Sequence, residues 1–180
     1  MISIKEQDER AIGDRFVEWF NTQYGLNYSF IRRAGEAPDL VYALPDKTEL
    51  FLEVTSAYYG NEYAKFIWDG VRSSEDQELE DEDADLDTKL VTDIVRIVGQ
   101  KCIKRYEKHC ILVVSVTSFW TSAKTLTQLL SKCEFPDNNF AAIFVHGRFS
   151  RFSLSPGESD YSMILIKEYP NTFLTKTNRK

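Results

Sequence analysis

The sequence predicts a single-domain α/β protein spanning residues 1–180. Helical periodicity recurs in two long segments, short runs rich in β-branched residues resemble strands, and strands alternate with helices in the second half of the chain. Hydrophobic residues make up 43% and charged residues 28% of the 180 positions, which is typical of a globular domain and excludes general disorder. Alternation of strands and helices indicates a sheet with helices on both faces.

The first half of the chain predicts one helix followed by three strands. Residues 6–24 form an amphipathic helix, because Ile12, Phe16 and Phe20 recur at a spacing of four residues, and Gly25 ends it. The strands over 39–44 and 49–55 form a hairpin around a turn at 45–47. The three strands cover residues 27–33, 39–44 and 49–55.

The second half predicts two helices that alternate with three strands. Residues 58–70 are aromatic and fit a short helix only ambiguously. The helix over 87–107 is the strongest prediction, with Leu90, Ile94, Val98 and Lys101 on one face. The apolar run CILVVSVT is typical of a strand covered on both faces. The remaining elements are strand 110–117, helix 121–132 capped by Thr121 or Ser122, strand 140–146, edge strand 161–167 and a frayed basic tail, TKTNRK.

The negative charge is concentrated in one segment. The net charge is −6, but nine acidic residues and no basic residue lie within 75–87. Like charges at this density repel one another, so a flexible acidic insertion is predicted at about 73–86. The rest of the chain carries slightly more basic than acidic residues, so the net charge does not exclude a nucleic-acid partner.

The composition also predicts a cytoplasmic protein with no membrane partner. There is no apolar run long enough to span a bilayer, and the N-terminus carries acids where a signal peptide has basic and then apolar residues. Cys102, Cys110 and Cys133 form no CxxC pair and are predicted to be reduced thiols.

Two carboxylates on neighbouring predicted strands are the strongest indication of chemistry. Asp39 opens one strand and Glu53 lies near the end of its hairpin partner. Carboxylates in apolar strands are costly, and two neighbouring ones also repel. Mg²⁺ resolves both costs, since it is commonly held by one or two carboxylates together with water and phosphate. The alternative is that Asp39 caps a turn after Pro38 and Glu53 pairs with an arginine.

The order of these parts resembles the restriction-endonuclease-like superfamily, whose signature is PD…(D/E)xK. Here a glutamate-bearing helix precedes Pro38-Asp39, the triplet Glu53-Val54-Thr55 follows, and then come a helix and a buried strand. The resemblance covers residues 6–117. It implies a three-layer α/β/α fold with a central mixed β-sheet. It also implies Mg²⁺-dependent hydrolysis of phosphodiester bonds, chiefly in DNA, with Mn²⁺ able to substitute.

The resemblance also implies roles for individual residues. Asp39 and Glu53 are expected to bind the metal, with the Val54 carbonyl as a further ligand. Glu9 is the matching helix glutamate, acting in the outer shell or on a second metal. Its alternative role is that of a first-turn acid favoured by the helix dipole. Thr55 stands where the superfamily has lysine and is expected to position water.

The missing lysine leaves two interpretations open. In one, the site is degenerate, and the protein binds nucleic acid or a protein instead of cutting. In the other, a lysine from elsewhere occupies the same space. Lys101 is the best replacement because it lies on the buried stripe of the 87–107 helix, and Lys104 lies one turn further on. Alternatively, both lysines complement the dipole at the C-terminal end of that helix.

Other features of the sequence allow two or more roles each. Arg32 and Arg33 either contact phosphates or are surface charges. An aromatic group either stacks on bases or covers the sheet; it comprises Tyr58, Tyr59, Tyr63, Phe66 and Trp68. The acidic insertion is either a solvated loop, a mimic of a nucleic-acid backbone or a docking site for a protein partner. A homodimer stays open, because nucleases of this superfamily often pair to cut two strands.

Overall fold

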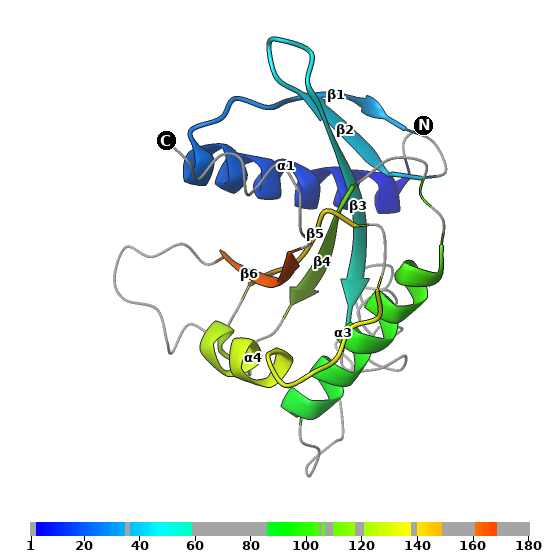
Figure 1. The fold of residues 1–180 in the computed structure, drawn as a ribbon, viewed down its shortest axis with the longest axis vertical. Helices are drawn as coiled ribbons and strands as arrows, with labels where there is room; N and C mark the ends of the chain where they lie inside the picture. Colours follow the sequence, from blue (N-terminus) through cyan, green and yellow to red (C-terminus); the bar gives the residue numbers. More distant parts are fainter. Residues whose placement is uncertain are drawn as a thin grey trace, which may run out of the picture.

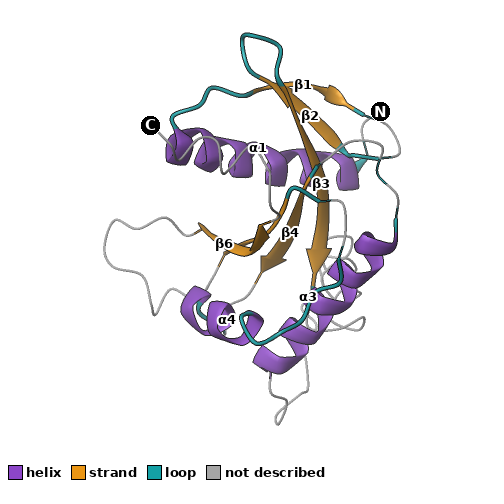
Figure 2. Cartoon of the chain, viewed as in Figure 1, coloured by secondary structure: helices purple, strands orange, loops and turns teal. Residues whose placement is uncertain are grey.

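The computed structural model describes residues 3–34, 37–58, 86–104, 106, 110–117, 121–137, 140–148 and 161–168. Within these ranges the chain forms one six-stranded mixed sheet with three helices packed on it, as Figures 1 and 2 show. The prediction of an α/β protein with a mixed sheet is therefore confirmed.

The elements follow the predicted order. They are α1 (Ile4–Tyr24), β1 (Ser29–Arg33), β2 (Leu40–Ala43), β3 (Glu49–Ala57), α3 (Leu86–Ile103), β4 (Ile111–Thr117), α4 (Ala123–Leu130), β5 (Ala142–Arg148) and β6 (Tyr161–Glu168).

Local sequence explains both ends of α1. Ser3 and Glu6 form a capping box, in which the Ser3 side chain accepts the Glu6 N–H and the Glu6 side chain accepts the Ser3 N–H. The helix therefore begins two residues before the predicted start. Gly25 ends the helix in the left-handed conformation, with φ at 64°, as its position predicted.

The sheet combines an antiparallel and a parallel half. The strands lie in the order β1-β2-β3-β4-β5-β6; β1, β2 and β3 are antiparallel neighbours, β3, β4 and β5 are parallel, and β6 returns antiparallel at the edge. The predicted edge strand is therefore confirmed. The central parallel strands are covered on both faces, which explains their continuous apolar sequences.

The helices divide between the two faces of the sheet. Alternate residues of β3 and β4, such as Leu52 and Val113, pack with α1 in one core cluster. Leu112 and Val114 pack with α3 and α4 in the other cluster. Figure 1 shows α1 running across the strands, whereas α3 and α4 lie side by side in the lower part of the view.

A glycine permits the close approach of α1 to the sheet. A Cβ on Gly13 would overlap the Leu40 side chain and lie 2.8 Å from the hydroxyl of Tyr42. That hydroxyl donates a 2.7 Å hydrogen bond to Asp14. The contact fixes the first half of α1 over β2.

Two predicted helices are longer than the observed ones. The helix predicted over 87–107 ends at Ile103, where the Lys104 N–H bonds the Lys101 carbonyl three residues back and tightens the last turn. The helix predicted over 121–132 spans only Ala123–Leu130. Ser122 caps it, while Thr121 donates its hydroxyl hydrogen to Asp87 instead.

Some expectations concern residues outside the described ranges. These are most of the aromatic segment 58–70, most of the acidic segment 73–86, and the basic tail. Tyr58 and Leu86 are the described members of the two segments. None of the described helices is long and apolar enough to cross a membrane.

Candidate functional site

A pocket of about 720 Å³ lies where β3 extends past the start of β2. Leu40, the first residue of β2, pairs with Leu52, so β2 does not accompany β3 beyond that point. The first turns of α1 and the last turn of α3 flank the opening. The lining residues are Ser3, Ile4, Lys5, Asp8, Glu9, Asp39, Glu53, Val54, Thr55, Ser56, Tyr58, Lys101 and Lys104.

Asp39 directly precedes β2 and lies beside the part of β3 that β2 does not pair with. Its Oδ2 accepts a 2.8 Å hydrogen bond from the Val54 N–H. In a strand the N–H and C=O of one residue point to the same side, so the Val54 carbonyl also faces this open edge. Burial, then the neighbouring charge of Glu53, raises the pKa of Asp39 from 3.8 to about 6, although the bond from Val54 opposes the shift.

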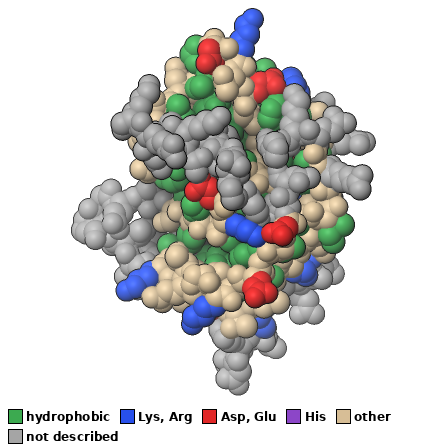
Figure 3. Space-filling view, viewed as in Figure 1, with side chains coloured by type: hydrophobic (Ala, Val, Ile, Leu, Met, Phe, Trp, Pro, Cys, Tyr) green, Lys and Arg blue, Asp and Glu red, His purple; other side chains and the backbone are tan. Residues whose placement is uncertain are grey.

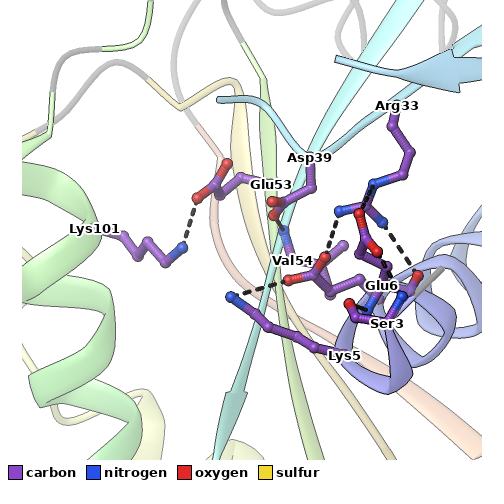
Figure 4. A network of polar contacts seen from close by, with 9 residues as sticks. Ser3, Lys5, Glu6, Arg33, Asp39, Glu53, Val54 and Lys101 are labelled. Carbon is purple, nitrogen blue, oxygen red and sulfur yellow. Dashed lines mark hydrogen bonds and ion pairs between the residues drawn. The ribbon is translucent and has the colours of Figure 1, made fainter. Parts of the chain in front are cut away.

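Glu53 lies on β3 and is only 2% exposed. The Lys101 ammonium, from α3, lies 2.5 Å from Glu53 Oε1. The other oxygen, Oε2, is buried and receives no well-formed hydrogen bond from the described residues, although the Tyr106 hydroxyl, also buried and without a well-formed bond, lies close enough to Glu53 to interact with it. Figure 4 shows Lys101 reaching Glu53 from the helix side, with Asp39 next to Glu53. The partner of Glu53 is therefore a lysine rather than the arginine considered as an alternative.

Glu9 approaches the pocket from α1 and is already engaged. Its Oε2 lies 2.8 Å from Arg33 Nη2, and its Oε1 lies 3.5 Å from the Lys5 ammonium. Arg33 also donates a 3.1 Å hydrogen bond to the Glu6 carbonyl and so ties β1 to the first turns of α1. Glu9 thus lies in the pocket wall with both carboxylate oxygens paired.

The other predicted site residues divide into two groups. Thr55 and Lys104 line the pocket, the first half-buried and the second exposed. Arg32 of β1 does not line it and lies 3.9 Å from Glu49, the first residue of β3. Of the aromatic group, Tyr58 lines the pocket, and the other members fall outside the described residues.

The sequence analysis missed Asp93 of α3, which is 7% exposed. Asp93 Oδ2 accepts a 2.8 Å hydrogen bond from the Tyr58 N–H, and Oδ1 accepts bonds of 2.9 and 2.5 Å from Arg96. These bonds fasten the end of β3 to α3 at the pocket rim. The available signal was an aspartate directly beside Ile94 on an otherwise apolar helix face.

Tyr106 and Cys110 lie within the electric field of the two acids. Both are buried, and burial followed by the charge of Glu53 raises their pKa values, to about 12 for Cys110. Cys110 is a protonated, inert thiol at neutral pH.

These donors fit a hard divalent cation. Within the described ranges no cluster of three or more His, Cys, Asp or Glu side chains is present. Mg²⁺ does not need such a cluster, because it commonly binds one or two carboxylates and completes its shell with water and phosphate. Asp39, the buried Glu53 Oε2 without a hydrogen bond and the Val54 carbonyl edge supply such a donor set.

No protein-family model matches the chain, and neither a curated protein nor a solved structure matches it.

Proposed function

We propose that the protein is a divalent-metal-dependent nuclease of restriction-endonuclease-like fold, which hydrolyses phosphodiester bonds of DNA. The observation that carries the proposal is Glu53, a carboxylate that is 2% exposed, beside Asp39 and with a buried oxygen that accepts no hydrogen bond from the described residues. A buried polar atom without a partner is costly unless it serves a ligand.

The arrangement of the chain supports the fold assignment. An N-terminal helix on one face, an antiparallel trio of strands, and a parallel strand reached through a helix on the other face give three layers. The acid at the start of β2 and the acid in β3 then meet at an open strand edge. This is the arrangement that the PD…(D/E)xK order implies.

In this proposal Asp39, Glu53 and the Val54 carbonyl hold Mg²⁺, for which Mn²⁺ can substitute. The bound ion supplies a water of lowered pKa and polarises the scissile phosphate. The Val54 N–H keeps Asp39 turned toward Glu53; Glu53 is buried, whereas Asp39 is half-buried at the pocket.

Other residues act on the substrate or on the geometry. The Lys101 ammonium stabilises the negative charge that develops on the phosphate, in place of the lysine that Thr55 replaces. The Thr55 hydroxyl, two residues after Glu53 and on the same face of β3, hydrogen-bonds the attacking water. Glu9, with both oxygens paired, is a positioning residue that binds Arg33 of β1 and the pocket residue Lys5.

The described surface charges on one face of the molecule are mixed in sign. On the face shown in Figure 3, described Lys and Arg side chains lie among Asp and Glu side chains rather than in one basic patch. Recognition of the phosphodiester is therefore assigned to two of the pocket lysines, Lys101 and Lys104, together with the metal. Tyr58 at the rim is positioned to contact a base.

The test is cleavage of plasmid DNA, single-stranded DNA and RNA with Mg²⁺, by the wild type, Glu53→Gln and Glu49→Gln. Glu49 lies on the same strand but is exposed and lies outside the pocket lining, so its variant is a matched control. We expect products from the wild type and from Glu49→Gln, and none from Glu53→Gln. Equal cleavage by Glu53→Gln would refute the assignment.

One observation favours a second candidate, a non-catalytic member of the same fold that binds nucleic acid or protein. The Lys101–Glu53 ion pair balances the buried charge without any metal. In that case none of the three polymers is cut, Mn²⁺ binds equally well with and without Asp39, and Lys101 is a structural residue.

A further inference from the structure

The Lys101–Glu53 contact raises a conflict within the proposed metal site. The ammonium lies 2.5 Å from Glu53 Oε1, with the two side chains only 17% and 3% exposed. A divalent cation held by Asp39 and Glu53 would lie within a few ångströms of that ammonium. Two positive charges this close, in a poorly solvated pocket, repel strongly.

We propose that Lys101 is the internal counter-ion of Glu53, and that its ammonium leaves Glu53 when a divalent cation binds and turns toward the substrate phosphate. The inference rests on the proposed function and adds a regulation of the same site. Before metal binds, Lys101 neutralises the buried carboxylate; afterwards the same group is free to meet the phosphate.

The remaining contacts make this exchange a local movement. Glu53 Oε2 and the second oxygen of Asp39 accept no hydrogen bonds from the described residues, so a cation can approach without first breaking the ion pair. Asp93 anchors α3 to the Tyr58 N–H two turns before Lys101. The helix therefore stays in place, and only the flexible lysine side chain has to move.

Competition makes a quantitative prediction, because Lys101 must lower the affinity for the metal that replaces it. Removing the ammonium should tighten metal binding, even though it removes a group that the reaction needs. A lysine that only stabilises substrate charge from its own position has no such effect on the metal. The direction of the change therefore separates the two roles.

The experiment is calorimetric titration of Mg²⁺ at pH 8.5. The proteins are the wild type, Lys101→Met, Lys5→Met and Asp39→Ala. Lys5 lines the same pocket, is 81% exposed and pairs with Glu9, so its variant removes an equal charge without touching Glu53. Lys101→Met should bind at least about tenfold more tightly, and Lys5→Met within about twofold of the wild type.

Three results would overturn the inference. The first is a Mg²⁺ affinity of Lys101→Met that is equal to or weaker than that of the wild type. The second is a gain in affinity in Lys5→Met as large as that in Lys101→Met, which would indicate only general charge repulsion. The third is an unchanged Mg²⁺ affinity in Asp39→Ala. The third result would show that Asp39 does not bind the metal, and so it refutes the proposed function. The first two leave the metal site intact and refute only the exchange.

A measurement on the wild type does not depend on the variant folding. The ¹H and ¹³C resonances of the Lys101 ε-methylene, followed during a Mg²⁺ titration, should shift with the calorimetric midpoint. A resonance that stays unchanged while Mg²⁺ saturates the Asp39-dependent site would show that Lys101 remains on Glu53.

Discussion

The backbone N–H of Val54 donates a 2.8 Å hydrogen bond to the Asp39 carboxylate. β2 begins at Leu40, which pairs with Leu52 of β3. Asp39 precedes this first pair, and its side chain rather than its backbone bonds the next part of β3. The bond holds Asp39 against β3, next to Glu53. Two acids far apart in sequence are thereby fixed at one pocket, at a cost to the stability of the metal-free protein.

That cost predicts that Asp39→Asn stabilises the metal-free protein. The pKa of Asp39 is raised to about 6 because folding buries its charge beside Glu53. The full shift corresponds to about 3 kcal/mol, and we expect about 1–2 kcal/mol at pH 7.5 because the side chain is partly exposed. Thermal unfolding in a chelator should show a melting temperature higher by about 3–6 °C.

The pH dependence fixes the cause of this gain. The folded-state pKa lies above the unfolded value of 3.8, so the protonated form stabilises the fold below about pH 4. This stability is lost as the pH rises through about 6. The advantage of Asp39→Asn should therefore be small at pH 4 and complete by pH 7. An advantage that does not change with pH would contradict the assignment to the Asp39 charge.

A double-mutant cycle on Lys101 and Glu53 measures the buried ion pair. Lys101→Met leaves Glu53 buried without its cation and should lower the free energy of unfolding by about 3–5 kcal/mol. Glu53→Gln should cost less, because the lysine can turn to water. The double variant should recover most of the loss.

Urea unfolding at pH 7.5 with a chelator checks this cycle. The control is Lys5→Met, which removes an exposed ammonium 3.5 Å from Glu9 and leaves Arg33 paired with Glu9, so it should cost no more than about 0.5 kcal/mol. Strictly additive effects of Lys101→Met and Glu53→Gln would mean that the two groups do not interact in solution.

A third prediction concerns the anchor of α3. Asp93→Ala removes the acceptor of the Tyr58 N–H as well as the partner of Arg96, whereas Arg96→Ala removes only the exposed cation. We expect losses of about 2 kcal/mol and at most about 1 kcal/mol, respectively. Urea unfolding measures both. Equal losses would show that the ion pair matters and the bond to the β3 end does not.

Sequence periodicity predicted much of the fold, because burial repeats at fixed spacings. The α1 stripe of Ile12, Phe16 and Phe20 and the apolar run of β4 are each buried as expected. The same periodicity directed attention to Lys101, whose stripe faces the strand that carries Glu53. The Gly25 stop needed only the conformational freedom of glycine.

Contacts between distant segments could not be predicted in the same way. Arg33 binds Glu9, and Asp93 binds the Tyr58 N–H, across elements that only the folded chain brings together. The choice of Ser122 over Thr121 as the helix cap likewise depends on Asp87, which engages the Thr121 hydroxyl from α3. The residues next to these side chains in the sequence do not indicate such distant partners.

The central claim is that Asp39 and Glu53 are assembled to bind a divalent cation. The most direct test is calorimetric titration of Mn²⁺ into the wild type and into Asp39→Ala at pH 7.5, since it does not require the substrate to be known. Weak binding to the acidic run at 75–87 is common to both proteins and cancels in the comparison. The account predicts one site in the wild type that Asp39→Ala loses. Identical isotherms for the two proteins would contradict it.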